Sequence, residues 1–295
     1  MMMILGRPLA AWLSQLVLGL QNGAFYAMLS LGLAIIFGML NIINFAHGAM
    51  FMMGAFATWM LANYLGIGYF PSLILAPLIV GFLGLLLEKT VISRLYKLDH
   101  LYGLLLTFGL ALVIEGLFRN AYGSSGMPYS PPAALEGATN LGFMYMPNYR
   151  GWVVAVALVV CLATWILIEK TSLGARLRAA TENPALVQAF GVNVPRLITL
   201  TYAGGVALAA LAGVLAAPIY SVNPNMGSSI INVVFAVVVI GGMGSIIGSV
   251  ITGFMLGVIE GLTKVLYPEG SGAVIFLVMV IILLAKPRGL FGKAA

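Results

Sequence analysis

Charged side chains are scarce in this sequence. Asp, Glu, Lys and Arg make up 7% of its 295 residues, against about 25% in an average soluble domain. Apolar residues make up 62%, more than a soluble chain of this length could bury. The composition therefore indicates an all-α, polytopic membrane protein. We expect about eight or nine transmembrane helices, some of them discontinuous.

Cysteine and histidine are scarce as well. Cys161 is the single cysteine, which excludes an intramolecular disulfide. No Cys, carboxylate or second His lies near enough to His47 in sequence to suggest a metal site, and no nucleophile–base arrangement is recognisable. The tail 286–293 ends its glycine motif in a lysine, but it lacks the spacing and the Ser or Thr of a phosphate loop. We expect no catalytic residue, metal, cofactor or nucleotide site in this chain.

Nine apolar stretches approach or exceed the roughly 20 residues that a bilayer-spanning helix needs. They cover residues 9–38, 48–64, 71–90, 101–118, 151–169, 197–219, 231–247, 250–267 and 271–286. The first stretch is longer than one untilted span requires. We treat residues 1–295 as one transmembrane domain with its spans over 9–286.

Basic residues gather in three connections. Segments 89–100, 170–196 and 286–293 hold 10 of the 14 Lys and Arg residues. An alternating path places all three on one side, which this bias identifies as the cytoplasm. The connection 119–150 is then external and the C-terminus cytoplasmic, while the side of the N-terminus stays open. The net charge of +6 thus reflects topology, and we expect a lipid bilayer and no nucleic acid as partner.

Small residues recur at every fourth position in two spans. The rows are Ser249, Gly253, Gly257 and Gly261, and Gly205, Ala209, Gly213 and Ala217. This spacing lets helix backbones approach closely. We favour packing within the chain, with a subunit interface as the alternative.

Polar residues interrupt the apolar sequence at 41–48 and again at 221–229. Paired interruptions in the two halves of a transporter indicate discontinuous helices beside a substrate path, although 221–229 is also compatible with a surface loop. For His47, a hydrogen-bonded structural role competes with titration near neutral pH. The candidates for the substrate path are Asn22, Asn41, Asn44, His47, Asn223, Asn225 and Ser228.

Two acid–base pairs lie within spans at i, i+4: Glu115 with Arg119, and Glu260 with Lys264. This order of charges is the favourable one on a helix, and long side chains near the end of a span can reach the interface. We interpret both pairs as structural, with a proton relay or a substrate contact as the alternative.

Segment 170–196 is the one long, mixed-charge amphipathic stretch. Asn183 is a good N-cap and Pro184 suits the first helical position. We therefore expect about two helical turns over 185–190, ended by Gly191.

Leu186, Val187 and Phe190 would share one face of this short helix. An apolar stripe on the cytoplasmic side must lie on lipid headgroups or in a groove of another protein. We favour the groove, and an ATPase as the protein that carries it.

The chain resembles, over essentially its whole length, the permease subunits of bacterial branched-chain amino acid importers of the ABC class, the LivH type. The resemblance rests on Asn22-Gly23, 42–48, Gly54-Ala55, 178–180, 190–193, 241–248 and 286–292. One segment departs from the general ABC-importer pattern, because Glu182-Asn183-Pro184-Ala185 stands where Glu-Ala-Ala is usual.

This resemblance implies a multi-pass subunit of the bacterial inner membrane that is not itself an enzyme. Its partners would be ATP-binding cassette ATPase subunits, a second permease, identical or different, and a periplasmic substrate-binding protein. Segment 170–196, the coupling loop, would meet the ATPase through its part 174–192 and switch the pore between outward and inward access. The implied contact residues are Arg178, Glu182, Leu186, Phe190 and Gly191. The substrate would be leucine, isoleucine, valine or a relative.

Other functions stay open. Permeases of this type also carry urea or short amides. A passive solute channel is a second possibility, because Asn223-Pro224-Asn225 is distantly similar to a half-helix signature of such channels, but 41–47 contains no proline for a second one. A proton-coupled carrier that uses Glu115 or Glu260 is a third.

Overall fold

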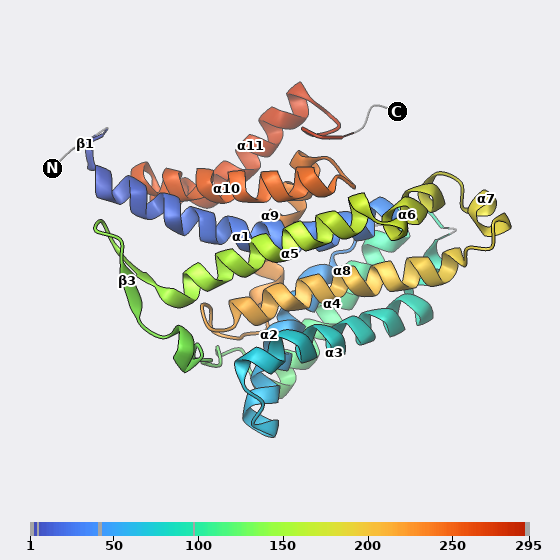
Figure 1. The fold of residues 1–295 in the computed structure, drawn as a ribbon, viewed down its shortest axis with the longest axis horizontal. Helices are drawn as coiled ribbons and strands as arrows, with labels where there is room; N and C mark the ends of the chain where they lie inside the picture. The colour runs from blue at the N-terminus through green and yellow to red at the C-terminus, as the bar shows by residue number, and fades with distance from the viewer. Residues whose placement is uncertain (1–2, 5, 41–42, 97, 293–295) are drawn as a thin grey trace. The chain divides into compact units, whose positions relative to one another are not determined.

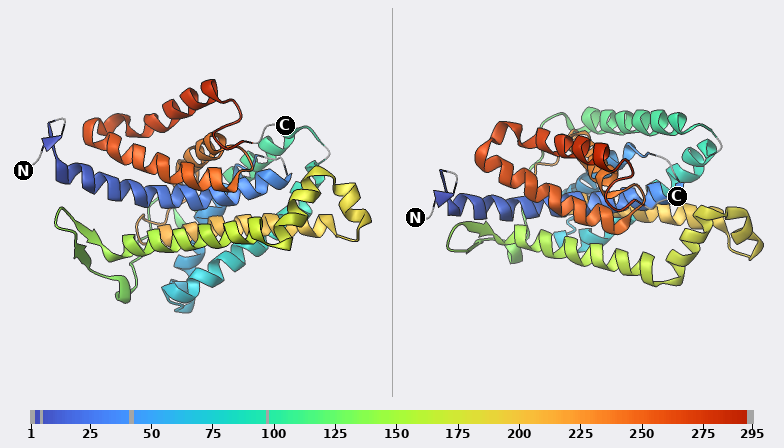
Figure 2. Two further views of the ribbon diagram at one scale, coloured as in Figure 1. Left: turned by 45° about the horizontal axis from the view of Figure 1, so that its top comes forward. Right: turned by 90° about the horizontal axis from the view of Figure 1, so that it is seen from above.

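The structure, a computed structural model, describes residues 3, 4, 6–40, 43–96 and 98–292 (Figures 1 and 2). Nine of its helices correspond to the nine predicted stretches. They are α1 (Leu9–Leu40), α2 (Ala46–Leu65), α3 (Tyr69–Thr90), α4 (His100–Tyr122), α5 (Asn148–Lys170), α8 (Val194–Ala216), α9 (Met226–Gly241), α10 (Ile246–Leu266) and α11 (Ser271–Ala285). The predicted all-α membrane fold is confirmed.

Seven helices among the described residues are long and apolar enough to cross a membrane. α2 and α9 are outside this set for different reasons. α2 is less apolar because it carries His47, Thr58 and Asn63, and most of its residues are buried; α9 has only 16 residues. The first apolar stretch is one helix of 32 residues, about 48 Å long at 1.5 Å per residue, so it must tilt or project beyond the hydrocarbon layer.

The chain divides into two compact units. Unit 1 comprises the chain up to Ser30, Pro131–Cys161 and the chain from Val233 onward; unit 2 comprises Leu31–Ser130 and Leu162–Asn232. Helices α1, α5 and α9 pass from one unit into the other. The prediction that residues 1–295 act as one transmembrane domain stays a prediction.

Unit 2 is organised around α8, against which α2 and α3 pack, while α4 packs on α2. Glycines explain how closely these helices approach. A Cβ atom on Gly213 of α8 would lie 2.9 Å from the Ala55 nitrogen of α2, and one on Gly205 would lie 2.9 Å from the Gly32 carbonyl oxygen of α1. The row of small residues in α8 therefore packs within the chain, as predicted.

Unit 1 is built on α1 and α10. A Cβ atom on Gly257 would lie 2.5 Å from the Gly19 carbonyl oxygen, and one on Gly253 would lie 2.6 Å from the Ala27 nitrogen. α11 adds Ile275 to an apolar cluster with buried residues of α9 and α10. The second row of small residues thus lies in a contact between two helices of one chain.

Short elements connect the spans. They are the strands β1 (Met3–Ile4), β2 (Arg7–Pro8), β3 (Ala138–Asn140) and β4 (Tyr145–Pro147), the 3-10 helices η1 (Ile92–Leu95), η2 (Ala133–Leu135) and η3 (Pro268–Gly270), and the helices α6 (Ser172–Glu182) and α7 (Pro184–Ala189). β1 pairs with β2 and β3 with β4, both antiparallel. The two hairpins lie at the same end of unit 1 (Figures 1 and 2).

The connection predicted to be external is shorter than 119–150. α4 continues to Tyr122 and α5 begins at Asn148, so Arg119 and Arg150 belong to helices. Polar residues in the last turn of a span resemble loop residues in a sequence, because long side chains there can extend toward water while the backbone stays helical.

Candidate functional site

The coupling loop folds into α6 and α7 between α5 and α8 (Figure 1). Asn183 caps α7, because its Oδ1 accepts a hydrogen bond from the Leu186 backbone nitrogen at 3.0 Å, and Pro184 is the first helical residue. Gly191 has φ +83°, a left-handed conformation that favours glycine. The predicted capped helix is confirmed, although it runs one residue earlier in the chain than expected.

The first helix of the loop, α6, is fastened to the end of α5. The Arg178 guanidinium donates to the Ile168 carbonyl oxygen at 2.7 Å and pairs with Glu169 at 3.4 Å. Leu177 and Ala180 are buried, and Gly174 lies so close to Ile168 that no side chain would fit. α6 therefore moves with α5.

The second helix, α7, presents apolar side chains outward. Phe190 is 81% exposed and Leu186 54%, whereas Val187 is partly buried. Glu182 and Gly191, at the two ends of α7, are exposed. An apolar surface carried on a fastened support is a suitable docking element for another protein.

A buried carboxylate that the sequence prediction missed lies between the end of α3 and the start of α8. Glu88, near the end of α3, is 2% exposed. It accepts hydrogen bonds from the hydroxyls of Thr199 in α8 at 2.6 Å and of Tyr96 at 2.5 Å. Burial and the hydrogen bond to Glu88 raise the pKa of Tyr96, so this hydroxyl stays protonated and donates. These contacts also place segments 89–100 and 170–196 at the same end of unit 2.

The first polar break lies between α1 and α2. Asn44 is 1% exposed and donates through Nδ2 to the Tyr202 hydroxyl of α8 at 3.0 Å. The Thr107 hydroxyl of α4 accepts from the Phe45 nitrogen at 3.2 Å and donates to the Ile43 carbonyl oxygen at 3.1 Å. α4 and α8 thus satisfy polar groups that a helix break exposes inside a membrane protein.

The other candidates for the substrate path in this part of the chain are His47, Asn41 and Asn22. His47 lies in the first turn of α2, is fully buried, and packs its ring beside Gly32 of α1. Asn41 is outside the described residues. Asn22 lies in the part of α1 that belongs to unit 1, so it is not grouped with the other candidates.

The second polar break, before α9, is held by α4 as well. Asn223 forms the turn, accepting from the Asn225 nitrogen at 3.0 Å. Arg119 donates to the Asn225 side-chain oxygen at 2.7 Å, and Glu115 is hydrogen-bonded to Ser228. No close ion pair joins Glu115 to Arg119 among the described residues, although the Arg119 charge still acts on Glu115; the structural role of this pair stays a prediction.

The starts of α2 and α9 meet each other. A Cβ atom on Gly48 would lie 2.6 Å from the Gly227 carbonyl oxygen, and both glycines are buried. The structure thus brings Asn44 and His47 together with α8 and α4 at one break, and Asn225 and Ser228 together with α4 at the other. Their place beside a substrate path stays a prediction.

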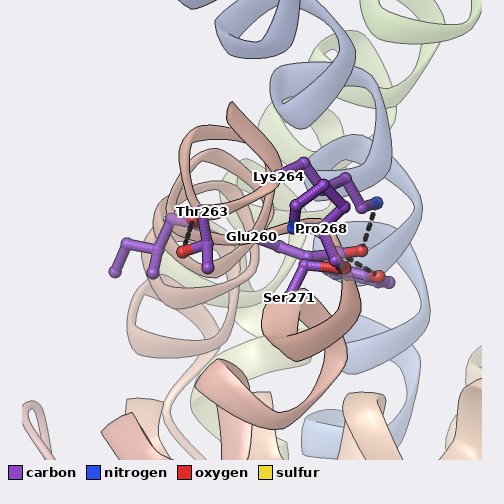
Figure 3. A network of polar contacts seen from close by, with 7 residues as sticks. Glu260, Thr263, Lys264, Pro268 and Ser271 are labelled. Carbon is purple, nitrogen blue, oxygen red and sulfur yellow. Dashed lines mark hydrogen bonds and ion pairs between the residues drawn. The ribbon is translucent and has the colours of Figure 1, made fainter. Parts of the chain in front are cut away.

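The second acid–base pair forms as predicted (Figure 3). Lys264 Nζ lies 2.6 Å from Glu260 Oε1, and the Tyr26 hydroxyl of α1 donates to Glu260 Oε2 at 2.7 Å. Glu260 is 8% exposed. No group of three or more His, Cys, Asp or Glu side chains within the described ranges could hold a metal ion.

Two motifs that carried the resemblance contact each other in unit 1. The Leu290 nitrogen donates to the Ile240 carbonyl oxygen at 2.7 Å and the Phe291 nitrogen to that of Gly241 at 3.2 Å. A Cβ atom on Gly289 would lie 2.6 Å from the Gly242 nitrogen. The C-terminal tail is therefore folded against the turn between α9 and α10.

Comparison with known proteins settles the family. The profile described as "Branched-chain amino acid transport system / permease component" matches residues 15–283. The chain belongs to this family. It is 28% identical to the high-affinity branched-chain amino acid transport system permease protein LivH of Salmonella typhimurium, and equally to that of Escherichia coli K12, over 96% of each chain. It is 27% identical to LivM of E. coli K12 over 90% of this chain and 67% of LivM. No solved structure matches.

Membership confirms the predicted LivH-type, multi-pass membrane permease. Because the profile covers both polar breaks and the coupling loop, these features lie within the permease component itself. The members it resembles are transport subunits rather than enzymes.

Proposed function

We propose that the chain is the membrane-spanning subunit of an ATP-driven importer of leucine, isoleucine, valine or a related amino acid. The names of its LivH relatives support this substrate class. Its similarity to both LivH and LivM, two permease proteins of one named type of system, supports a second permease of related fold as its partner.

The ATPase would dock on the coupling loop. The observation that carries this proposal is Phe190, 81% exposed at the end of a helix whose neighbour α6 is fastened to α5. Leu186 would join Phe190 in a groove of the ATPase, with Arg178 and Glu182 at the rim and Gly191 giving the turn. ATP hydrolysis would belong to that partner.

We propose that the chain lies in the bacterial inner membrane, with the coupling loop and the C-terminal tail on the cytoplasmic side. The shared position of segments 89–100 and 170–196 at one end of unit 2 supports this. The β1–β2 hairpin lies at the same end of unit 1 as β3–β4 of the external connection, which favours an external N-terminus. A periplasmic binding protein would deliver substrate to that side.

The substrate would pass near the two helix starts of unit 2. Asn44 and His47 place polar groups at the first start, and Arg119 and Glu115 of α4 already engage the polar residues of the second. Such a path binds a zwitterion weakly and leaves selectivity to the soluble binding protein.

Affinity purification of the tagged chain from native membranes, followed by reconstitution into liposomes, tests this function. We expect an ATPase and a second permease to co-purify, and uptake of labelled leucine to require ATP and the binding protein. Flux through the chain alone without ATP would instead support a channel, uptake driven by a pH gradient a carrier, and preference for urea or acetamide another substrate class.

A further inference from the structure

A short pattern recurs in the two halves of the chain. Gly81-Phe82 is followed by Glu88 in α3, and Gly253-Phe254 by Glu260 in α10, at the same spacing. Both glutamates are buried, and each accepts a hydrogen bond from a hydroxyl on a long neighbouring helix. Such internal repeats are common in transporter folds.

The hydroxyl donors to the two glutamates also correspond. Glu88 of α3 accepts from Thr199 of α8 in unit 2, and Glu260 of α10 accepts from Tyr26 of α1 in unit 1. In each unit the glutamate lies toward the end of its helix, where the two helices run antiparallel. The repeat therefore gives each unit one buried carboxylate that joins two helices.

The carboxylate of unit 2 lies close in the chain to the coupling loop. Thr199 is in the second turn of α8, which begins at Val194, within the last residues of that loop. Tyr96, the second donor to Glu88, follows η1. Glu88 thus ties together α3, the connection after it and the first turns of α8.

The same face of α8 continues to the first polar break. Tyr202 lies three residues after Thr199, so the two side chains share one side of the helix. Tyr202 accepts from Asn44 at 3.0 Å. α8 therefore carries, within one turn, a contact to the buried carboxylate and a contact to a candidate substrate-path residue.

We propose that Glu88 is a positioning residue for transport. Its carboxylate holds the first turns of α8 against α3. When the coupling loop moves, α8 then rotates as one rigid helix, and this rotation displaces Tyr202 relative to Asn44. This inference rests on the proposed docking of an ATPase at the coupling loop. Without Glu88, the first turns of α8 unwind or bend, and movement of the coupling loop no longer displaces Tyr202.

The test compares Glu88→Gln with Glu260→Gln, the same change at the equivalent position of unit 1. Glutamine keeps the side-chain length and one oxygen acceptor, but it replaces the other oxygen with an amino group that cannot accept, so one of the two hydroxyls loses its acceptor. The first measurement is hydrogen–deuterium exchange of the purified chain, which needs no ATPase. We expect Glu88→Gln to raise exchange in 194–202, and Glu260→Gln to leave that segment unchanged.

The second measurement is leucine uptake per ATP hydrolysed by the complete importer in liposomes. Loss of a buried hydrogen bond changes an equilibrium by about tenfold. We expect Glu88→Gln to keep ATP hydrolysis but lower uptake per ATP about tenfold, and Glu260→Gln to leave this ratio unchanged. Rescue by Glu88→Asp, which restores two acceptor oxygens, would support positioning further.

Three results would overturn the inference: unchanged exchange in 194–202, an unchanged ratio of uptake to hydrolysis, or an equal fall of that ratio in both variants. If the wild-type complex contains no ATPase, the proposed function fails, and the exchange measurement alone still decides whether Glu88 holds α8.

Discussion

The α3–α8 pair of unit 2 and the α1–α10 pair of unit 1 are both joined by a buried glutamate. They differ in which atoms face the glycines between the two helices. In α10, Gly257 faces the backbone of α1, and a Cβ atom there would lie 2.5 Å from the Gly19 carbonyl oxygen. In α3, Gly84 faces the Val206 side chain, 2.8 Å from a Cβ atom. Backbone cannot retreat without moving a whole helix, whereas a single side chain can shift slightly within its surroundings. The α1–α10 contact is therefore the less tolerant of an added methyl group, whereas the start of α8 is fixed to α3 by the hydrogen bond to Glu88.

The largest expected difference between the two pairs comes from adding one methyl group to each. Gly257→Ala should lower the free energy of unfolding by about 3 kcal/mol or more, because overpacking here forces two backbones apart. Gly84→Ala should cost less, about 2 kcal/mol, because only the Val206 side chain and not a backbone must shift. Thermal unfolding of both variants in detergent measures the difference, and equal losses would show that the two contacts are alike.

A smaller difference in the free energy of unfolding is expected between two variants that each remove one hydrogen-bond donor from a buried glutamate. Lys264→Met leaves Glu260 with Tyr26 and should cost about 2 kcal/mol, less than a fully buried pair would, because Lys264 is partly exposed. Tyr96→Phe leaves Glu88 with Thr199 and should cost about 1 kcal/mol. Unfolding in a denaturant series compares them. A greater loss in Tyr96→Phe would mean that Glu88 depends mainly on that hydroxyl.

The smallest effect on stability is expected at two left-handed glycines. Gly191 (φ +83°) and Gly66 (φ +65°) both have open space around the missing Cβ atom. Alanine at either position should cost about 1 kcal/mol, from backbone strain alone. Only Gly191→Ala should also lower ATP-driven uptake, because it alone shapes the coupling loop. Uptake measured at matched protein levels checks this, and an equal fall in Gly66→Ala would contradict it.

Much of this fold can be predicted from the sequence because bilayer spans are long and apolar. All nine predicted stretches form helices, and the capped helix of the coupling loop was predictable because Asn183 and Pro184 act through their immediate neighbours. The Glu260–Lys264 pair was predictable for the same reason, since both residues lie on one helix turn.

Contacts between distant segments were not predictable in this way. Glu115 and Arg119 have the same spacing as the second pair, yet they bind residues of the second polar break. Glu88 went unnoticed beside the basic residues that follow it, although the repeated Gly-Phe pattern before Glu88 and Glu260 was visible in the sequence. Thr107 gave no signal, because a single threonine in an apolar span is ordinary.

The most direct test of the account is a cross-link between Phe190 and the ATPase. Cys161 is buried and can be replaced by serine, so that Phe190→Cys and the control Tyr145→Cys each place one exposed cysteine on the chain. Tyr145 is 71% exposed in β4, on the connection that we propose is external. The account predicts that a short thiol-reactive cross-linker joins the ATPase to position 190 and not to position 145. An adduct at position 145, or none at position 190 in an importer that still transports leucine, would contradict it.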